Sequence, residues 1–116
     1  MMNLALSFEL LQAVATMNPD GFTVDVNTFE PITTGYAVAV AETQNSFGNQ
    51  GAAKVVSYAY KHPEIKAFGG WFNTDNNSYY YDAVIICSTL EEAITLGREN
   101  GQIAIFNLST LEEIRL

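Results

Sequence analysis

Apolar side chains recur with the spacing of an amphipathic helix near the start and in the middle of the chain. From Leu4 onward they fall at i, i+4 and i+7, and the run Asn-Pro-Asp-Gly at 18–21 cannot continue a helix, so the pattern predicts a helix over 3–17. A second stripe predicts a helix over 50–61, which ends where His62 is followed by proline. Each of these helices therefore has one apolar face to bury.

A third predicted helix carries signals at both of its ends. Ser88-Thr89-Leu90-Glu91 has the form of a capping box, in which the Ser88 side chain caps the helix and Glu91 follows three residues later. Arg98 lies in the last turn, and Gly101 follows as the C′ glycine. The side chains expected to face the core are those of Leu90, Ala93, Ile94 and Gly97.

Alternating apolar and polar residues predict strands between the helices. A half-buried strand begins at Phe22, and a turn follows at Glu30-Pro31. In the strand predicted over 35–43 both sets of side chains are apolar or small, apart from the last two positions, so we expect a central strand covered on both sides. Residues 102–108 form a further strand, and 113–116 can return against it as a last hairpin.

The segment 65–87 predicts an aromatic β-hairpin. Aromatic and β-branched residues lie on both sides of the polar turn 73–78, which cannot continue a strand. Alternation places Asp82 on the same side of its strand as Tyr80. The opposite side is the expected core face and carries Tyr79, Tyr81, Ala83 and Ile85.

Four residues of this hairpin are the candidate binding residues. Trp71 and Phe72 point to opposite faces, so at least one large ring lies outside the core and can anchor a partner. Asp82 lies within an apolar strand beside Tyr80, where a carboxylate must find hydrogen-bond donors or shift its pKa upward, and such a group can mark a site. The alternative is a structural carboxylate that a hydroxyl, the backbone or solvent satisfies.

The order of these elements predicts a single α+β domain over 1–116. The order is α-β-β-α-β-β-α-β-(β), which indicates one mainly antiparallel sheet of five to six strands with three helices packed on one face. A chain of 116 residues with 48% hydrophobic content is long enough for one core. The single cysteine, Cys87, cannot form an internal disulfide, and its place at the end of an apolar run indicates a buried, inert thiol.

The charge balance narrows the class of partner. Thirteen acidic and five basic residues give a net charge of −8, and no Lys/Arg cluster is present to displace phosphate counterions, so we expect no nucleic-acid binding. The excess of acid suits a protein that docks on a basic partner, although it also serves solubility alone. The N-terminus lacks the basic region of a signal peptide, and no window approaches the roughly 20 apolar residues of a membrane span. We therefore expect a cytoplasmic protein that does not enter a membrane.

The sequence carries no complete motif for catalysis, metal binding or cofactor binding. His62 is the sole histidine, which excludes a two-histidine metal motif, and its position suits an interaction with a helix C-terminus. The Asx motif at 73–77 is similar to the start of a calcium loop, but Ser78 and Val84 replace the Gly and Glu that the loop requires. Gly48-x-x-Gly51 can cradle an anion at a helix start but lacks the lysine of a nucleotide loop. We predict no metal and no cofactor.

Much of the chain after residue 20 resembles small uncharacterised proteins of bacterial chromosomes, conjugative elements and phages, notably of gut bacteria. The matching segments are 35–38 (Gly-Tyr-Ala-Val), 42–44 (Glu-Thr-Gln), 69–82 (from Gly-Gly-Trp to Tyr-Tyr-Asp) and 92–106 (from Glu-Ala-Ile to Ile-Ala-Ile-Phe). The resemblance implies no activity, cofactor or catalytic residue. Leu111 departs from it, because the similar chains prefer a turn glycine there, and this departure bears on whether the last hairpin forms.

Three functions remain open on these observations. The leading hypothesis is a non-enzymatic accessory protein of a mobile element that binds another protein through the aromatic hairpin or the second sheet face. The first alternative is an acidic anti-defence inhibitor that occupies a nucleic-acid-binding cleft. It would need one contiguous acidic face, for which the candidates are Glu91, Glu92, Glu99, Glu112 and Glu113. The second alternative is a small enzyme, which requires Asp82, His62 and a tyrosine to converge in one cleft.

The predicted sheet also has more apolar surface than the helices can cover. Three helices cover about one face of such a sheet, and the other face would expose a larger apolar patch than monomers usually tolerate. We therefore expect a homodimer formed through that face or along an edge strand, with the small side chains Ala37, Ala39 and Ala41 permitting close approach.

Overall fold

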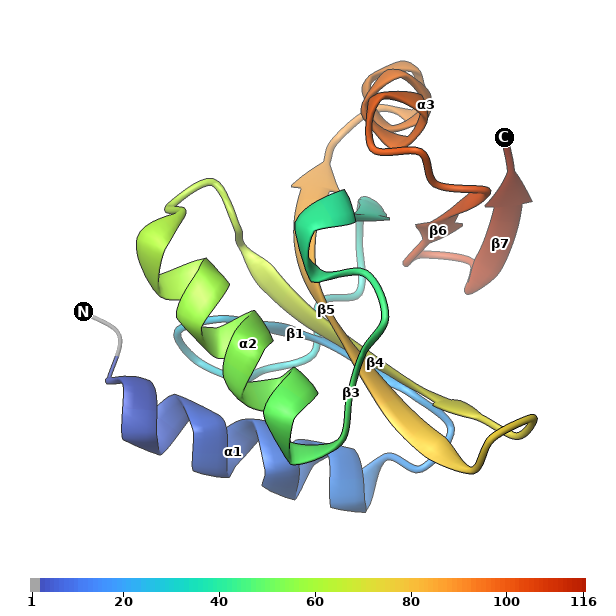
Figure 1. Cartoon of the computed structure of the whole chain (residues 1–116). Coiled ribbons are helices and arrows are strands. Elements are labelled where there is room, and N and C mark those ends of the chain that lie inside the picture. The colour runs from blue at the N-terminus through green and yellow to red at the C-terminus, as the bar shows by residue number, and fades with distance from the viewer. Residues whose placement is uncertain (1–2) are drawn as a thin grey trace.

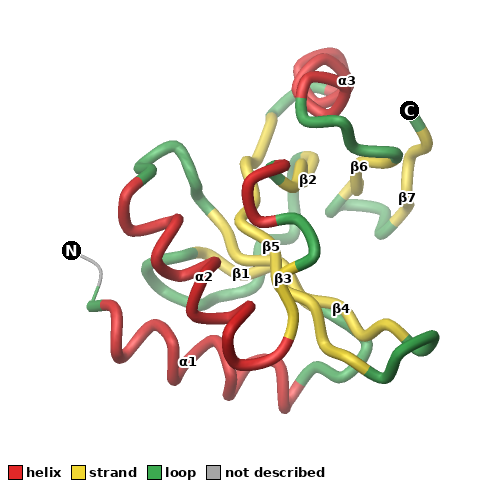
Figure 2. Tube along the Cα trace, in the orientation of Figure 1, coloured by secondary structure: helices red, strands yellow, loops and turns green. Residues whose placement is uncertain are grey.

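The computed structural model describes residues 3–116 of the chain, in which three helices lie against one antiparallel sheet (Figures 1 and 2). The helices are α1 (Leu4–Met17), α2 (Gly48–Lys61) and α3 (Leu90–Glu99), and a 3-10 turn, η1, covers Ala41–Thr43. The strands are β1 (Phe22–Asp25), β2 (Tyr36–Ala39), β3 (Ser46–Phe47), β4 (Ala67–Asn73), β5 (Ser78–Cys87), β6 (Ala104–Asn107) and β7 (Glu112–Arg115).

Strand β5 is the central element of the sheet. The strand order is β1-β4-β5-β2-β6-β7, and β3 pairs with β5 outside this path. One edge of β5 pairs with β4 along the aromatic hairpin, while the other edge pairs first with β3 and then with β2. The predicted α+β class and order of elements are confirmed, and the two-residue strand β3 is an addition that the sequence did not predict.

All three helices pack on the same face of the sheet. Alternation along β5 directs Tyr81, Ala83 and Ile85 to one side. Tyr81 and Ala83 belong to the core beneath α1 and α2, and Ile85 contacts both that core and the smaller cluster beneath α3. The predicted core face of β5 and the placement of the helices on one side are therefore confirmed.

The other face, which we call the helix-free face, is covered over half of its length. Ala67 and Val84 point to this side and are buried, although none of the helices described in residues 3–116 lies over them. In the connection from β1 to β2, Val26 and Phe29 pack into the core on the helix side. Residues 32–35 then lead to β2 on the far side of the β4–β5 pair, and because α2 packs on the helix side of β5, we assign the cover of Ala67 and Val84 to these residues. The half nearest the hairpin turn is left open.

The second predicted strand is shorter than expected because the chain turns away from the sheet after β2. Pairing with β5 stops at Ala39, and residues 41–43 form η1 instead of extending the strand. The buried Thr43 side chain then supplies a hydrogen bond that a neighbouring strand would otherwise make, since its Oγ1 accepts the backbone N–H of Ala83 at 3.0 Å. The prediction of one strand over 35–43 was wrong in its second half, and only the α3 side of β2 is covered by a helix.

Two details of α3 also differ from the prediction. The N-cap is Thr89, not Ser88: the Thr89 Oγ1 accepts the N–H of Glu92 at 3.2 Å and donates to its Oε1 at 2.9 Å. The capping box is thus shifted by one residue, which turns Leu90 outward to 40% exposure. Ala93 and Gly97 are buried as expected.

The last hairpin forms. Strand β7 pairs with β6 over four residues, and the turn between them places Leu111 in the left-handed region at φ +62°.

Helix α2 begins at Gly48, two residues earlier than predicted. A Cβ at Gly51 would lie 2.4 Å from the backbone carbon of Ser46, so this glycine serves the close approach of α2 to β3.

The longest helices, α1 and α2, have 14 residues each. Within residues 3–116, none of the helices has both the length and the apolar character that crossing a bilayer requires.

Candidate functional site

Three aromatic rings from three adjacent strands lie side by side on the open half of the helix-free face. Trp71 on β4 stacks on Tyr80 on β5 with ring centroids 4.8 Å apart, and Phe47 on β3 lies 5.4 Å from the same tyrosine ring. The pairings Trp71↔Tyr80 and Phe47↔Tyr80 set this arrangement, since directly opposed residues project on the same side of a sheet. We call these three residues the aromatic ladder. Trp71 is 43% exposed and Phe47 51% exposed, so solvent reaches both ends of the ladder.

The hairpin turn holds the central ring of the ladder in place. Asn73 Oδ1 accepts the N–H of Asp75 at 2.9 Å, and Asn76 Oδ1 accepts the N–H of Ser78 at 3.1 Å. The Asn76 amide also donates to the Tyr80 hydroxyl at 2.8 Å. The Asx residues are therefore used to build the turn and to orient Tyr80, as side chains of this kind commonly do.

Asp82 lies next to the ladder on the same face. It follows Tyr80 by two positions along β5 and faces Gly69 across the β4–β5 pair, where no side chain stands. Its carboxylate makes no hydrogen bond or ion pair with any residue of the described chain, and burial raises the pKa of this carboxyl to about 6. A nearly buried carboxylate without a partner is costly to keep ionised, so an arriving hydrogen-bond donor or cation would stabilise it.

The other groups around Asp82 do not supply that donor. On β5 its same-face neighbours are Tyr80 and Val84, and on β1 the same-face positions beyond Gly69 are Thr23 and Asp25. The Asp25 carboxylate accepts two backbone N–H groups of its own loop, at 2.8 and 3.1 Å. Asp82 is therefore surrounded by aromatic, apolar and acidic neighbours.

Phe72 does not belong to this site. It points to the helix side, 6.4 Å from the Tyr79 ring, and the Tyr79 hydroxyl donates to the Asn18 carbonyl at 2.6 Å. Burial, with smaller contributions from Tyr81 and Asp20, raises the pKa of Tyr79 to about 12, so this hydroxyl stays protonated and ties the end of α1 to the hairpin. Of the four candidate residues, Trp71, Tyr80 and Asp82 come together and Phe72 lies on the opposite face.

Phe47 is the member of the ladder that sequence reasoning missed. A strand of two residues has no alternating pattern to recognise, and the chain around it is polar. The available signal was an aromatic residue directly before the glycine that opens a helix, which does not by itself indicate a sheet face.

His62 lies on the other side of the sheet from Asp82. It follows the C-terminus of α2, where its ring is tilted against that of Tyr58 with centroids 3.8 Å apart and its Nδ1 lies 2.8 Å from the Tyr58 carbonyl oxygen. A shallow groove there is lined by Glu42, Thr43, Lys54, Ser57, Tyr58, Lys61 and His62. Because α2 and the sheet separate the two groups, His62 and Asp82 do not converge in one cleft.

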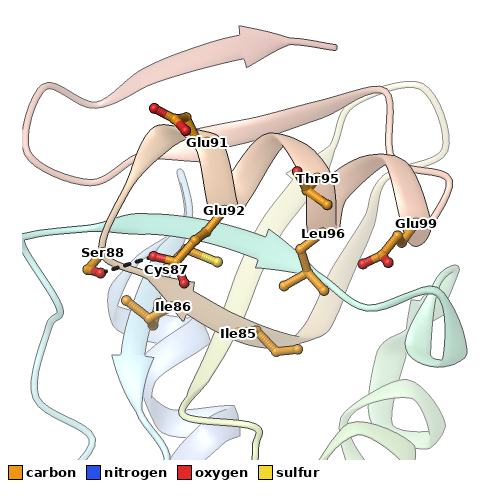
Figure 3. A pocket seen from close by; sticks show the side chains of 9 residues that line it. All are labelled: Ile85, Ile86, Cys87, Ser88, Glu91, Glu92, Thr95, Leu96 and Glu99. Carbon is orange, nitrogen blue, oxygen red and sulfur yellow. Dashed lines mark hydrogen bonds between the residues drawn. The ribbon is translucent and has the colours of Figure 1, made fainter.

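A second open groove of about 640 Å³ lies between α3 and the end of β5 (Figure 3). Its lining consists of Ile85, Ile86, Cys87, Ser88, Glu91, Glu92, Thr95, Leu96 and Glu99. Ser88 Oγ donates to Glu92 Oε1 at 3.3 Å, and burial, followed by the Glu92 carboxylate, raises the pKa of the Cys87 thiol. The thiol is thereby kept in its unreactive, protonated form.

The acidic side chains singled out from the sequence do not form one face. Three glutamates line the groove beside α3, although Figure 3 shows the Glu91 carboxylate directed away from β5. Glu112 and Glu113 lie on β7, where they project to opposite sides, and Glu113 is 3.5 Å from the Arg115 guanidinium. Residues 3–116 also contain no group of three or more His, Cys, Asp or Glu side chains placed to hold a metal ion.

The fold and this surface define an α+β protein with one helix-covered sheet face and one partly open face that carries exposed aromatic rings. Comparisons of the chain with protein-family models, with curated proteins and with solved structures find no match.

Proposed function

We propose that this protein is a cytoplasmic, non-enzymatic accessory protein that binds another protein through the aromatic ladder and Asp82. The observation that carries the proposal is the placement of exposed aromatic rings on the half of the sheet that residues 3–116 leave uncovered. Tyr and Trp dominate the energy of many protein interfaces, because they bury a large area and lose little side-chain entropy. The resemblance to small proteins of conjugative elements and phages suits an accessory role in a mobile element.

The distribution of reactive groups supports binding over catalysis. Asp82 lies on the helix-free face, His62 lies beyond α2, and the Cys87 thiol is buried beside α3. General acid–base or nucleophilic catalysis needs at least two such groups within hydrogen-bond reach of one substrate. An exposed aromatic surface needs no such convergence to bind a protein.

The groove beside α3 supports a second candidate function. Glu91, Glu92 and Glu99 are among the residues that line one groove in a chain with a net charge of −8, and of their carboxylates that of Glu91 points away from β5. An acidic inhibitor that occupies the nucleic-acid-binding cleft of another protein would use such a surface. The two functions differ in the side chains on which binding depends.

The test is quantitative co-purification from the native host with matched variants. The double variant Trp71→Ala/Phe47→Ala removes both exposed ends of the ladder, and Tyr60→Ala is the control, because Tyr60 is an equally exposed ring (51%) on α2. The proposal expects a partner that the wild type and Tyr60→Ala recover equally and the double variant loses.

Each alternative outcome has a distinct meaning. Recovery that depends on Glu91, Glu92 and Glu99, but not on the ladder, supports the acidic inhibitor instead. A partner recovered equally by all variants contradicts both candidates. Folding of each variant is checked by urea denaturation, in which loss of the Trp71–Tyr80 pair is expected to cost about 1 kcal/mol beyond the area that the Trp71 ring buries.

A further inference from the structure

We infer that the partner presents an arginine to this surface, with its side chain packed along the exposed Trp71 ring and its guanidinium hydrogen-bonded to the Asp82 carboxylate. This inference rests on the proposed function and names the chemistry of the partner group. It concerns a surface on which the Trp71 ring is exposed and the Asp82 carboxylate has no hydrogen-bond or ion-pair partner in the described chain.

The geometry of the face brings the two required elements together. Trp71 and Tyr80 form a stacked pair, and Asp82 follows Tyr80 by two positions on the same side of β5. Two residues along a strand correspond to roughly 7 Å, which a side chain lying along the face can span. A guanidinium donates two parallel hydrogen bonds to a carboxylate, and the apolar stem of an arginine packs on aromatic surface, so one arginine side chain can engage both elements.

Charge complementarity selects a cation over other occupants. The five basic residues of the chain lie elsewhere: Lys54 and Lys61 line the groove beside α2, Lys66 precedes β4, Arg98 lies on α3, and Arg115 is next to Glu113. The titratable groups that share the face near Asp82 are Asp25 and Tyr80, neither of which supplies a positive charge. The face therefore attracts a cation from outside the chain.

The same charges disfavour the two other possible occupants of this surface, a nucleic acid and a second copy of the chain. A nucleic-acid strand would bring phosphates to an acidic face without lysine or arginine to neutralise them. A second copy of this chain, also at −8, would bring the partnerless carboxylate and the acidic surroundings of one copy against those of the other. An arginine of a basic partner would instead pair with the Asp82 carboxylate and offset the cost of its burial.

The test uses the sole tryptophan as a reporter, since Trp71 lies within the proposed contact. Its fluorescence is titrated with a short Gly/Arg peptide and with the matched peptide in which citrulline, the neutral isostere, replaces each arginine. The inference expects saturable binding of the arginine peptide and affinity about tenfold or more weaker for the citrulline peptide, the effect of losing a charge-assisted hydrogen bond.

Variants then assign the binding to Asp82. Asp82→Asn is expected to weaken the binding of the arginine peptide by about tenfold or more. Asp75→Asn is the control, because it removes the same charge from the exposed turn of the same hairpin and leaves the affinity nearly unchanged. Binding by the wild type should also weaken as the pH falls below about 6 and Asp82 becomes protonated, and Asp82→Asn should lose this dependence.

Three results overturn the inference. They are equal affinity for the arginine and citrulline peptides, equal loss in Asp82→Asn and Asp75→Asn, and no binding of the arginine peptide at all. In each case the proposed function is judged separately, by whether the captured partner still depends on Trp71 and Phe47. A partner that depends on the ladder but not on Asp82 leaves the proposed function standing and removes arginine recognition.

Discussion

At the scale of single residues, Asp82 and Leu111 are among the positions whose states cost folding free energy. Asp82 keeps a carboxyl group in a nearly buried site without a partner, and Leu111 holds a branched side chain at φ +62°. Strain of this kind persists where the surrounding structure over-determines the residue, and it marks a functional site only when the surroundings also fit a ligand. Asp82 meets that condition beside the aromatic ladder, whereas Leu111 lies in an exposed turn.

The first prediction concerns the pH dependence of stability at Asp82. The folded pKa of about 6 lies above the ordinary value of 3.8, so the stability that Asp82 provides is complete below 3.8 and is lost as the pH rises through about 6. Asp82→Asn removes the ionised carboxylate, and because the site is partly open to solvent we expect a gain in unfolding free energy of about 1–2 kcal/mol at about pH 7.5. The gain should shrink towards about pH 5.

Urea denaturation of wild type and variant at the two pH values measures this difference. Asp75→Asn serves as the control, since its exposed carboxylate in the same hairpin should produce no such gain. A difference between Asp82→Asn and the wild type that is independent of pH would show that Asp82 is not the titrating group.

The second prediction concerns the turn between β6 and β7. The Leu111 side chain is 73% exposed and contributes little burial, while a non-glycine residue in the left-handed region costs roughly 1–2 kcal/mol. Leu111→Gly should therefore raise the unfolding free energy by about 0.5–1 kcal/mol, after the greater chain entropy of glycine is subtracted. Leu111→Ala keeps the Cβ and should bring no comparable gain, and equal effects of the two variants in thermal melts would contradict the explanation.

At the scale of elements, the backbone groups along the edge of β5 opposite β4 find their hydrogen-bond partners in three different ways. Strand β3 pairs with Tyr80 and Tyr81, the Thr43 hydroxyl accepts the N–H of Ala83, and β2 pairs from Val84 onward. The side-chain hydroxyl thus bridges the gap between two short strands. This bridge lets the chain leave the sheet as η1 and return as β3, which places Phe47 on the ladder.

The third prediction tests this bridge. Thr43→Val keeps the shape of the buried side chain but leaves the Ala83 N–H without its acceptor, which should cost about 1–3 kcal/mol of unfolding free energy. Thr33→Val is the control, because Thr33 is exposed and a surface change of this kind usually stays within about 0.5 kcal/mol. Amide hydrogen exchange adds a local readout: the Ala83 amide should lose protection in Thr43→Val, and unchanged protection would contradict the role of the hydroxyl.

At the scale of the whole molecule, two core clusters share one sheet and leave its other face half open. The cluster beneath α1 and α2 and the cluster beneath α3 meet at Ile85, so the helix side is closed from β1 to β7. On the helix-free side we assign the cover of one half to residues 32–35, and the open half carries the ladder and an acidic group rather than a purely apolar patch. This composition favours a foreign basic partner over a second copy.

The fourth prediction follows from that composition. Without a partner, light scattering at micromolar concentration should give a mass near 12.7 kDa, because repulsion between two chains of −8 opposes association through an acidic face. A mass of two copies that Trp71→Ala returns to one would instead support the homodimer expected from the sequence. The ladder would then be the self-association surface, and the arginine inference would be lost.

Local patterns were sufficient for most of the elements and for part of the site. Helical periodicity, the glycine after α3 and the alternation along β5 depend on neighbours a few residues apart, and from them the three helices, the hairpin and the shared side of Tyr80 and Asp82 could be predicted. The shift of the cap to Thr89 was beyond these patterns, because Ser88 and Thr89 are both suitable caps with a glutamate three residues later.

The sequence by itself determined the class of fold, the order of elements and the core face of the central strand, because these follow from periods of 2 and 3.6 residues along the chain. Tertiary structure alone decided that Phe47 joins Trp71 and Tyr80, that Thr43 replaces a strand beside Ala83, and that His62 and Asp82 lie apart. These relations join residues 20 to 40 positions apart, and they depend on which strands pair and in which register. No local pattern carries that information, since register is set by the packing of the whole sheet.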